Sequence, residues 1–98
     1  MSAYVLAEIE IIDPERYKEY VIHVPVTIAK YGGRFLVRGG AAEILEGEWP
    51  QIRRVLIEFP SLEVAKRWWT SSDYEKPKAM RRAASKGRLI LLDGVQAT

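Results

Sequence analysis

The sequence predicts an α+β fold, in which one antiparallel sheet is covered by helices on a single face. Segments in which apolar and polar residues alternate, as in half-buried strands, lie at 4–12, 34–38, 52–59 and 88–92. Two stretches with apolar residues at helical spacing separate the first strand from the second and the third from the fourth. A length of 98 residues fits one domain, which we expect to span 1–98.

The helix after the first strand has recognisable ends. Asp13 can accept hydrogen bonds from the free N–H groups of the first turn, and Pro14 suits the first helical position. Gly32 is the expected stop, because glycine readily adopts the left-handed conformation that ends many helices. Pro25 lies between these ends and should kink the helix, since it lacks a backbone donor.

The segment Tyr31–Gly40 is the most distinctive part of the chain. Two glycine pairs bracket a short strand, and the second pair, Gly39-Gly40, should let the chain bend or turn. Strict alternation divides the strand between the two faces of the sheet, with Phe35 and Val37 under the helices and Arg34, Leu36 and Arg38 on the opposite face.

The chain between the second and third main strands is expected to be partly regular. Residues 42–46 predict a further short strand, which either continues the second strand or forms a hairpin arm. Residues 47–50 contain Gly and Pro and predict a loop before the strand at 52–59.

The second helical stretch is predicted to be broken in two. Ser61 is the expected N-cap, and the inner face is predicted from Leu62, Ala65 and Trp69, with Trp68 beside it. Ser72-Asp73 interrupts this helix. The shorter helix that follows should bury one face, comprising Ala79, Met80 and Ala83, and end at Gly87.

The resulting order, β-α-β-(β)-β-α-β, predicts a ferredoxin-like βαββαβ antiparallel sheet with its helices on one face. The other face mixes large apolar side chains with charged ones: Tyr4, Leu6, Glu8, Leu36, Leu56, Ile90 and Leu92, with Arg34, Arg38, Arg54 and Glu58. An apolar patch with a polar rim is typical of an interface. We therefore expect a homodimeric α+β barrel, in which two sheets pack face to face around a small cavity.

Composition argues against several classes of protein. The formal net charge is +2 with a pI near 9.0, but no nucleic-acid-binding motif or basic-aromatic stripe accompanies it, so we expect no nucleic-acid partner. The chain has no Cys and a single His, which predicts no disulfide and no metal site. We recognise no signal peptide or membrane span, so we expect no membrane partner and a cytoplasmic location.

Several segments together resemble a known family. They are Tyr31–Gly40, Leu45–Trp49, Ile57–Ser61, Trp68, Ser72-x-Tyr74, Arg81 and Asp93-Gly94. The combination is similar to the domain of unknown function numbered 1330, within the dimeric α+β barrel superfamily. The resemblance implies a ferredoxin-like protomer and a homodimer, and it implies no established activity. The superfamily includes cofactor-free monooxygenases, isomerases and haem proteins, so the fold alone leaves the function open.

Two arginines are the first candidates for a ligand site. Arg34 and Arg38 would share a face of the sheet, where a guanidinium can hold a carboxylate or enolate in bidentate fashion. The alternative is an ion-pair network in which Glu8 and Glu58 neutralise them.

Proton transfer would need a base near that site. Glu58 is one candidate, provided that burial raises the pKa of its carboxyl group, and His23 on the first helix is the other. A histidine on the helix surface and a carboxylate paired with arginine are the competing interpretations.

Aromatic and basic residues complete the candidate site. Trp49 lies in a Gly/Pro loop and could cover a ligand, while Tyr74 and Arg81 could close one end of the barrel or anchor a helix to the sheet. Two functions stay open. One is a homodimer that binds a small anionic or enolisable molecule, with proton transfer or cofactor-free oxidation and no cofactor. The other is a non-catalytic dimeric module whose sheet-face charges form structural ion pairs.

Overall fold

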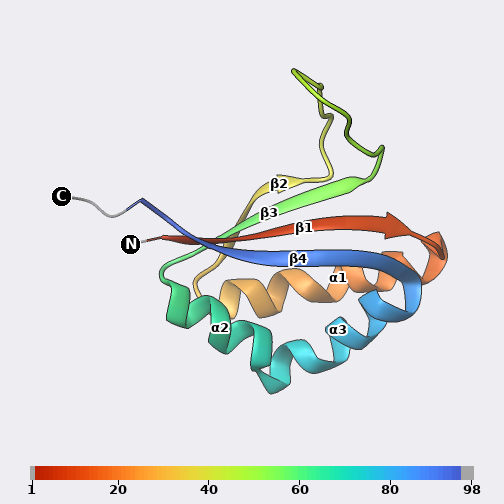
Figure 1. The fold of residues 1–98 in the computed structure, drawn as a ribbon. Coiled ribbons are helices and arrows are strands. Elements are labelled where there is room, and N and C mark those ends of the chain that lie inside the picture. The colour runs from red at the N-terminus through yellow and green to blue at the C-terminus, as the bar shows by residue number, and fades with distance from the viewer. Residues whose placement is uncertain (1, 96–98) are drawn as a thin grey trace.

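The computed structural model describes residues 2–95 and has the predicted α+β architecture (Figure 1). Its elements are β1 (Ala3–Ile11), α1 (Pro14–Lys30), β2 (Arg34–Arg38), β3 (Arg53–Phe59), α2 (Leu62–Thr70), α3 (Ser72–Ala84) and β4 (Ser85–Asp93). All strand pairs are antiparallel, and the strand order β2-β3-β1-β4 confirms the ferredoxin-like sheet. The three helices cover one face of the sheet, and we call the other face the open face (Figure 1).

The helix ends follow the sequence signals. Asp13 accepts a hydrogen bond from the N–H of Arg16, and Gly32 ends α1 with a φ of +72°. Ser71 caps both helices at the break between α2 and α3. Its N–H donates to the carbonyl of Trp68 at the end of α2, and its side chain accepts from the N–H of Tyr74 at the start of α3.

Strand β2 departs from strict alternation. Phe35 pairs with Ile57, but the next pair joins Val37 to Leu56, so Leu36 is an extra residue in a β-bulge. A single extra residue exchanges the faces of everything beyond it. Val37 therefore lies on the open face, and Arg38, opposite Val55, lies on the helix face. The prediction that Arg34 and Arg38 share a face was wrong for this reason.

The core is built around an aromatic cluster that the sequence located only in part. Trp68 is fully buried, stacks on Tyr74 with ring centroids 4.1 Å apart, and donates from its indole nitrogen to the Thr27 hydroxyl at 3.0 Å. Trp69, predicted as the inner residue, is only half-buried. Helix α3 buries a different face from the predicted one, formed by Tyr74, Pro77, Arg81 and Ala84.

Two predicted local features were wrong. Residues 42–46 form no strand, because they find no ladder partner among residues 2–95. Gly87 does not end α3, which stops at Ala84, but pairs with Ile9 inside β4. A Cβ at Gly87 would lie 2.7 Å from the Cδ1 of Ile9, so close strand packing explains this glycine.

No helix within residues 2–95 has the length and apolar character required to cross a bilayer.

Candidate functional site

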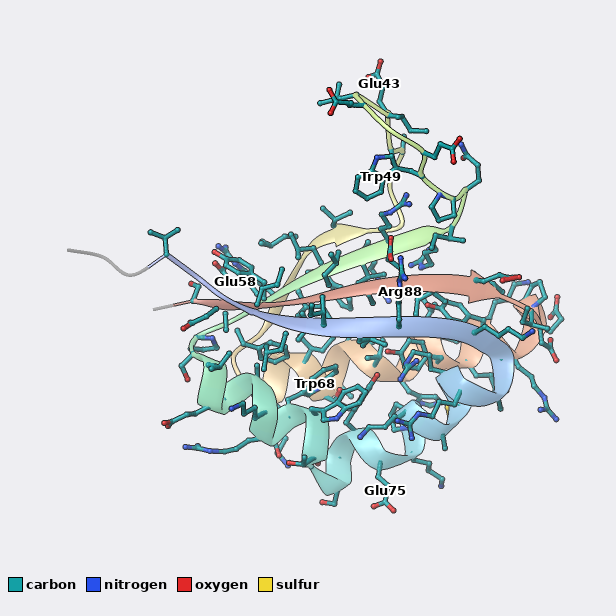
Figure 2. All side chains as sticks on the ribbon, viewed as in Figure 1. Glu43, Trp49, Glu58, Trp68, Glu75 and Arg88 are labelled. Carbon is teal, nitrogen blue, oxygen red and sulfur yellow. The ribbon has the colours of Figure 1, made fainter. Side chains whose placement is uncertain are left out.

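The predicted site residues fall on two sides of the sheet, and the open face holds the first group (Figure 2). Glu8 lies between two arginines of the neighbouring strands. Its carboxylate accepts from the Nε of Arg88 at 2.6 Å and from the Nε of Arg54 at 3.2 Å. The hydrogen bond from Arg88 is the largest cause of a lowered pKa for Glu8. These three side chains form an ion-pair network.

Glu58 is similarly paired on the same face. It accepts from the Nε of Arg34 at 2.7 Å and from the hydroxyl of Tyr4 at 3.3 Å. The Arg34 hydrogen bond and then that of Ser2 hold the pKa of Glu58 below its usual range. A general base near neutral pH needs a raised carboxyl pKa, so the surroundings of Glu58 oppose the role predicted for it.

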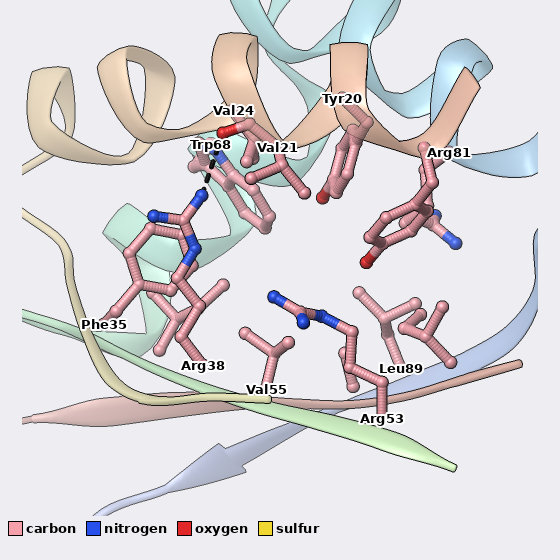
Figure 3. A pocket seen from close by; sticks show the side chains of 14 residues that line it. Tyr20, Val21, Val24, Phe35, Arg38, Arg53, Val55, Trp68, Arg81 and Leu89 are labelled. Atoms are coloured by element: carbon pink, nitrogen blue, oxygen red, sulfur yellow. Dashed lines mark hydrogen bonds between the residues drawn. The ribbon is translucent and has the colours of Figure 1, made fainter. Parts of the chain in front are cut away.

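The helix face holds the second group, around a cavity enclosed by the sheet, α1, α2 and α3 (Figure 3). Three arginines line it: Arg38 from β2, Arg53 from β3 and Arg81 from α3. Aromatic and aliphatic side chains form the rest of the wall, among them Tyr17, Tyr20, Phe35, Val55 and Trp68. The free space inside is about 20 Å³, which is room for about one water molecule.

The side chain of Arg38 is held by a backbone carbonyl that a proline leaves without its usual helical donor. The carbonyl of Val21 would normally accept from the N–H four residues later, but that residue is Pro25, which has no N–H. The Nη2 of Arg38 donates to this carbonyl at 2.8 Å instead, and its guanidinium lies 4.3 Å from the ring centre of Phe35. The missing donor expected from the sequence is thus replaced by a side chain from β2.

Arg53 has an unusual environment. Its Nε is buried and has no hydrogen-bond partner in the described chain. Its guanidinium lies 5.8 Å from the ring centre of Tyr17, and Figure 3 shows it pointing from β3 toward α1. A buried donor without a partner is unfavourable, so this nitrogen calls for an explanation beyond packing.

Arg81 is the most deeply buried of the three, with 4% of its surface exposed. Its Nε donates to the hydroxyl of Tyr74 at 3.3 Å, and that hydroxyl lies 2.9 Å from the hydroxyl of Tyr20. Burial, followed by the neighbouring Tyr74, raises the pKa of Tyr20 far above its ordinary value. The phenol of Tyr20 is therefore a neutral hydrogen-bonding group and not a base at physiological pH.

The charged side chains of the cavity wall are all positive. Within residues 2–95, none of its three arginines forms an ion pair with an acidic side chain, whereas Arg34, Arg54 and Arg88 all do. No acidic or histidine side chain lines the cavity wall as described. Arg81 is buried, Arg53 is half-buried and Arg38 is exposed. A buried cation without a counter-charge is destabilising unless an anion joins it. The arrangement is suited to holding a small anion.

The structure therefore divides the predicted site. Arg38 and Arg81 line the cavity, and Tyr74 contacts Arg81 behind its wall. Arg34 and Glu58 lie on the open face. His23 is exposed on α1, and Trp49 lies in the loop between β2 and β3. No three histidine or acidic side chains of residues 2–95 meet in a way that could hold a metal ion.

Sequence reasoning missed Arg53, Tyr17 and Tyr20 as lining residues. One signal for Arg53 was available. Arg53 and Arg54 are neighbours in a strand, so one of the two must point toward the helices. Tyr17 and Tyr20 were assigned to the apolar stripe of α1. That assignment considered their apolar rings and not the hydroxyl groups that can form hydrogen bonds.

A four-stranded antiparallel sheet in the order β2-β3-β1-β4, with three helices on one face, defines a ferredoxin-like α+β protein. Residues 2–95 match the family described as a domain of unknown function (DUF1330), and the chain belongs to this family. The resemblance inferred from the sequence is thus confirmed. No protein with a curated function matches the chain.

Solved structures show the same fold at low sequence identity. RPA0582, a protein of unknown function from Rhodopseudomonas palustris, is 19% identical with a TM-score of 0.77, covering 98% of this chain and 84% of its own. SnoaB, a cofactor-independent oxygenase from Streptomyces nogalater, is 11% identical with a TM-score of 0.63, covering 98% of this chain and 95% of its own. An antibiotic biosynthesis monooxygenase is 13% identical with a TM-score of 0.54, covering 98% and 100%.

Proposed function

We propose that this protein binds a small organic anion, with a planar carboxylate or enolate group, in the cavity between the sheet and the helices. The observation that carries the proposal is the group of three arginines without acidic partners, in which the Nε of Arg53 is buried and unbonded. A planar anion accepts two parallel N–H bonds from a guanidinium, which would supply that missing acceptor.

The neutral phenol of Tyr20 suits the same ligand. Its hydroxyl lines the cavity and lies 2.9 Å from the hydroxyl of Tyr74, which accepts from Arg81. The Tyr20 hydroxyl can donate to an oxyanion and keep its own proton, because burial raises the pKa of Tyr20. With no acidic or histidine side chain in the described wall, the site stabilises an anion that arrives already ionised or enolised.

Entry of an organic ligand requires a side chain to move. The free space of about 20 Å³ is too small for a ring, whereas Arg38 is exposed and Arg53 is half-buried beside it at the ends of β2 and β3. A rotation of the Arg53 side chain toward the ends of β2 and β3 would enlarge the cavity and keep its guanidinium beside the entering ligand. We infer that the ligand enters between these two arginines and leaves the aromatic core around Trp68 unchanged.

Binding can be tested by calorimetric titration with benzoate, salicylate and acetylacetone, using benzamide as the matched neutral compound. Arg53→Gln should weaken anion binding by about tenfold or more, because a hydrogen bond to a charged group contributes about 1.5–3 kcal/mol. Arg82→Gln is the matched control, since Arg82 is exposed on α3 next to Arg81. Equal binding of benzamide and benzoate, or equal effects of the two variants, would contradict the proposal.

A second candidate function is cofactor-free oxidation of the bound anion. It is favoured by the fold shared with SnoaB, whose description is that of a cofactor-independent oxygenase. Stabilising an enolate by fixed cations and phenol donors is the catalytic contribution that this cavity could make. Oxygen consumption in an electrode chamber with acetylacetone as substrate tests it. No consumption above the rate of the Arg53→Gln variant would leave binding as the function.

We also propose that the protein is a homodimer formed through the open face. Four apolar side chains cross the middle of this face in register, one from each strand: Val37, Leu56, Leu6 and Ile90. Val37 is 42% exposed and Ile90 55% exposed. An apolar row between two ion-pair rows resembles the apolar centre and polar rim of protein interfaces. Light scattering at micromolar concentration tests the dimer, and Leu6→Asp should give a monomer that still binds benzoate.

A further inference from the structure

The loop between β2 and β3 has a composition unlike the rest of the chain. We call residues 39–52 the acidic arm. It contains Glu43, Glu46 and Glu48 and no lysine or arginine. None of the three glutamates forms an ion pair within residues 2–95. The arm therefore presents three negative charges that the described protomer leaves unbalanced.

The arm also exposes apolar side chains at its far end. Leu45 is 95% exposed and Ile44 is 49% exposed. In Figure 1 the arm extends from the ends of β2 and β3, away from the helices. Exposure of large apolar side chains on a projecting segment is characteristic of a contact with another molecule.

The base of the arm is held in a defined position on the open face. Arg54, an open-face residue, donates from Nη2 to the carbonyl of Pro50 at 2.9 Å, and its guanidinium lies 5.4 Å from the ring centre of Trp49. The indole nitrogen of Trp49 donates to the carbonyl of Glu46 at 2.9 Å. An arm fixed in this way is positioned to contact a molecule that binds to the open face.

A basic region lies at the opposite edge of the same face. Arg88 and Lys86 belong to β4, the edge strand farthest from β2, and the side chain of Arg88 is 79% exposed. Arg88 shares the single carboxylate of Glu8 with Arg54, so this network of two cations and one anion keeps a positive charge. The open face is thus acidic along the arm and basic along β4.

These two regions are complementary between two copies of the chain. If a two-fold axis runs parallel to the strands, the strand order reverses, so β2 of one copy faces β4 of the other and β3 faces β1. Leu56 then meets Leu6, Arg54 meets Glu8, and Arg88 meets Gly39, where the arm begins. The four apolar side chains of the central row face one another, and the facing charges of Arg54 and Glu8 are opposite. In the remaining row Leu92 faces Arg34, and Tyr4 faces Glu58.

We propose that the acidic arm of each copy binds the Lys86–Arg88 end of β4 on a second copy. Each protomer of the dimer would then contact the edge strand of its partner through its arm. This inference rests on the homodimer of the proposed function. It adds a reciprocal contact outside the sheets. Since the arm joins β2 and β3 next to Arg38 and Arg53, each arm would also connect the partner to the entrance of the anion cavity.

Sedimentation velocity on the full chain tests the contact. Replacing Glu43, Glu46 and Glu48 together by Lys should weaken dimerisation by about tenfold or more, and Arg88→Glu should weaken it similarly. Combining the four changes should restore an affinity close to that of the unchanged protein. A loss of folding would not give this rescue. The matched control is Lys at Glu19, Glu63 and Glu75, which are exposed on the helices and should leave dimerisation unchanged.

The outcomes separate the two proposals. If the unchanged chain is a monomer that binds benzoate, the homodimer and the arm contact both fail while the cavity proposal stands. If it is a dimer of equal affinity with and without the arm changes, only the arm contact fails. Binding of the arm to lipid vesicles or to an unrelated protein, with the dimer unaffected by the charge changes, would likewise overturn it.

Discussion

The side chain of Arg53 occupies the space that a side chain at Gly39 would need. A Cβ at Gly39 would lie 2.7 Å from the Cζ of Arg53, and Gly39 has a φ of +71°, which other residues rarely adopt. The second glycine pair, Gly39-Gly40, is therefore linked to the one arginine of residues 2–95 whose Nε is buried without a hydrogen-bond partner.

This relationship predicts unequal effects for the two glycines. Gly39→Ala should lower the free energy of unfolding by about 1–2 kcal/mol from backbone strain alone and weaken benzoate binding by displacing Arg53. Gly40→Ala is the matched control, because a Cβ there would have no neighbour within 4 Å. Urea denaturation and calorimetric titration measure both effects, and equal results for the two variants would contradict the role given to Gly39.

The hydrogen bond from Arg38 to Val21 predicts an energetic coupling with Pro25. In a Pro25→Ala chain, the new N–H can donate to the Val21 carbonyl, so Arg38→Ala should destabilise that chain by about 0.5–1 kcal/mol less than it destabilises the unchanged one. A double-mutant cycle in urea measures the difference. Arg82→Ala, far from Pro25 in sequence and exposed, should show no coupling, and additive effects of the first pair would refute the explanation.

The paired carboxylates predict a loss of stability in acid. Glu8 and Glu58 have pKa values below their ordinary 4.5 because arginines hydrogen-bond to the charged forms. The contribution of these two carboxylates to the free energy of unfolding is complete above about pH 4.5. It disappears as the pH falls through their lower native pKa values. Between about pH 5 and 3, the free energy of unfolding should fall more steeply for the unchanged protein than for a Glu8→Gln/Glu58→Gln variant. Parallel curves would show that the pairs contribute little.

The exposed position of His23 predicts that it is dispensable. His23→Gln should change the free energy of unfolding by no more than about 0.5 kcal/mol, as is usual at surface positions, and should leave benzoate affinity unchanged. Chemical denaturation and calorimetry check both. A tenfold loss of anion binding would return His23 to the candidate site and would place the ligand elsewhere than in the cavity.

The sequence predicted the fold well because the signals it carries are local. Alternation, the caps at Asp13 and Ser61, and the helix stop at Gly32 depend on neighbours within a few residues. The choice between Trp68 and Trp69 was different. Both lie near the inner stripe of α2, and the hydrogen bond from Trp68 to Thr27, 41 positions earlier, accompanies the burial of Trp68.

The candidate site was predicted less well, because its composition depends on register. The bulge at Leu36 leaves no clear mark in the sequence, yet it moves Arg38 from one side of the sheet to the other. Arg81 was named from the family resemblance, but its burial beside Tyr74 reverses the usual expectation for a charged residue on a helix. Pairing of Arg34 with Glu58 was foreseen as the alternative interpretation.

The bulge makes the faces of Val37 and Arg38 depend on the length of β2, which substitution experiments would not reveal. Removing Leu36 alone would leave a regular strand in which Val37 still pairs with Leu56 on the open face and Arg38 still pairs with Val55 under the helices. If the strand kept its present length but lost the bulge, Val37 would turn toward the helices and Arg38 toward the open face, so one cation would leave the cavity. A single-codon deletion at Leu36 would thus keep the charge of the ligand site, and a one-residue gap in this strand is compatible with an unchanged site in related chains.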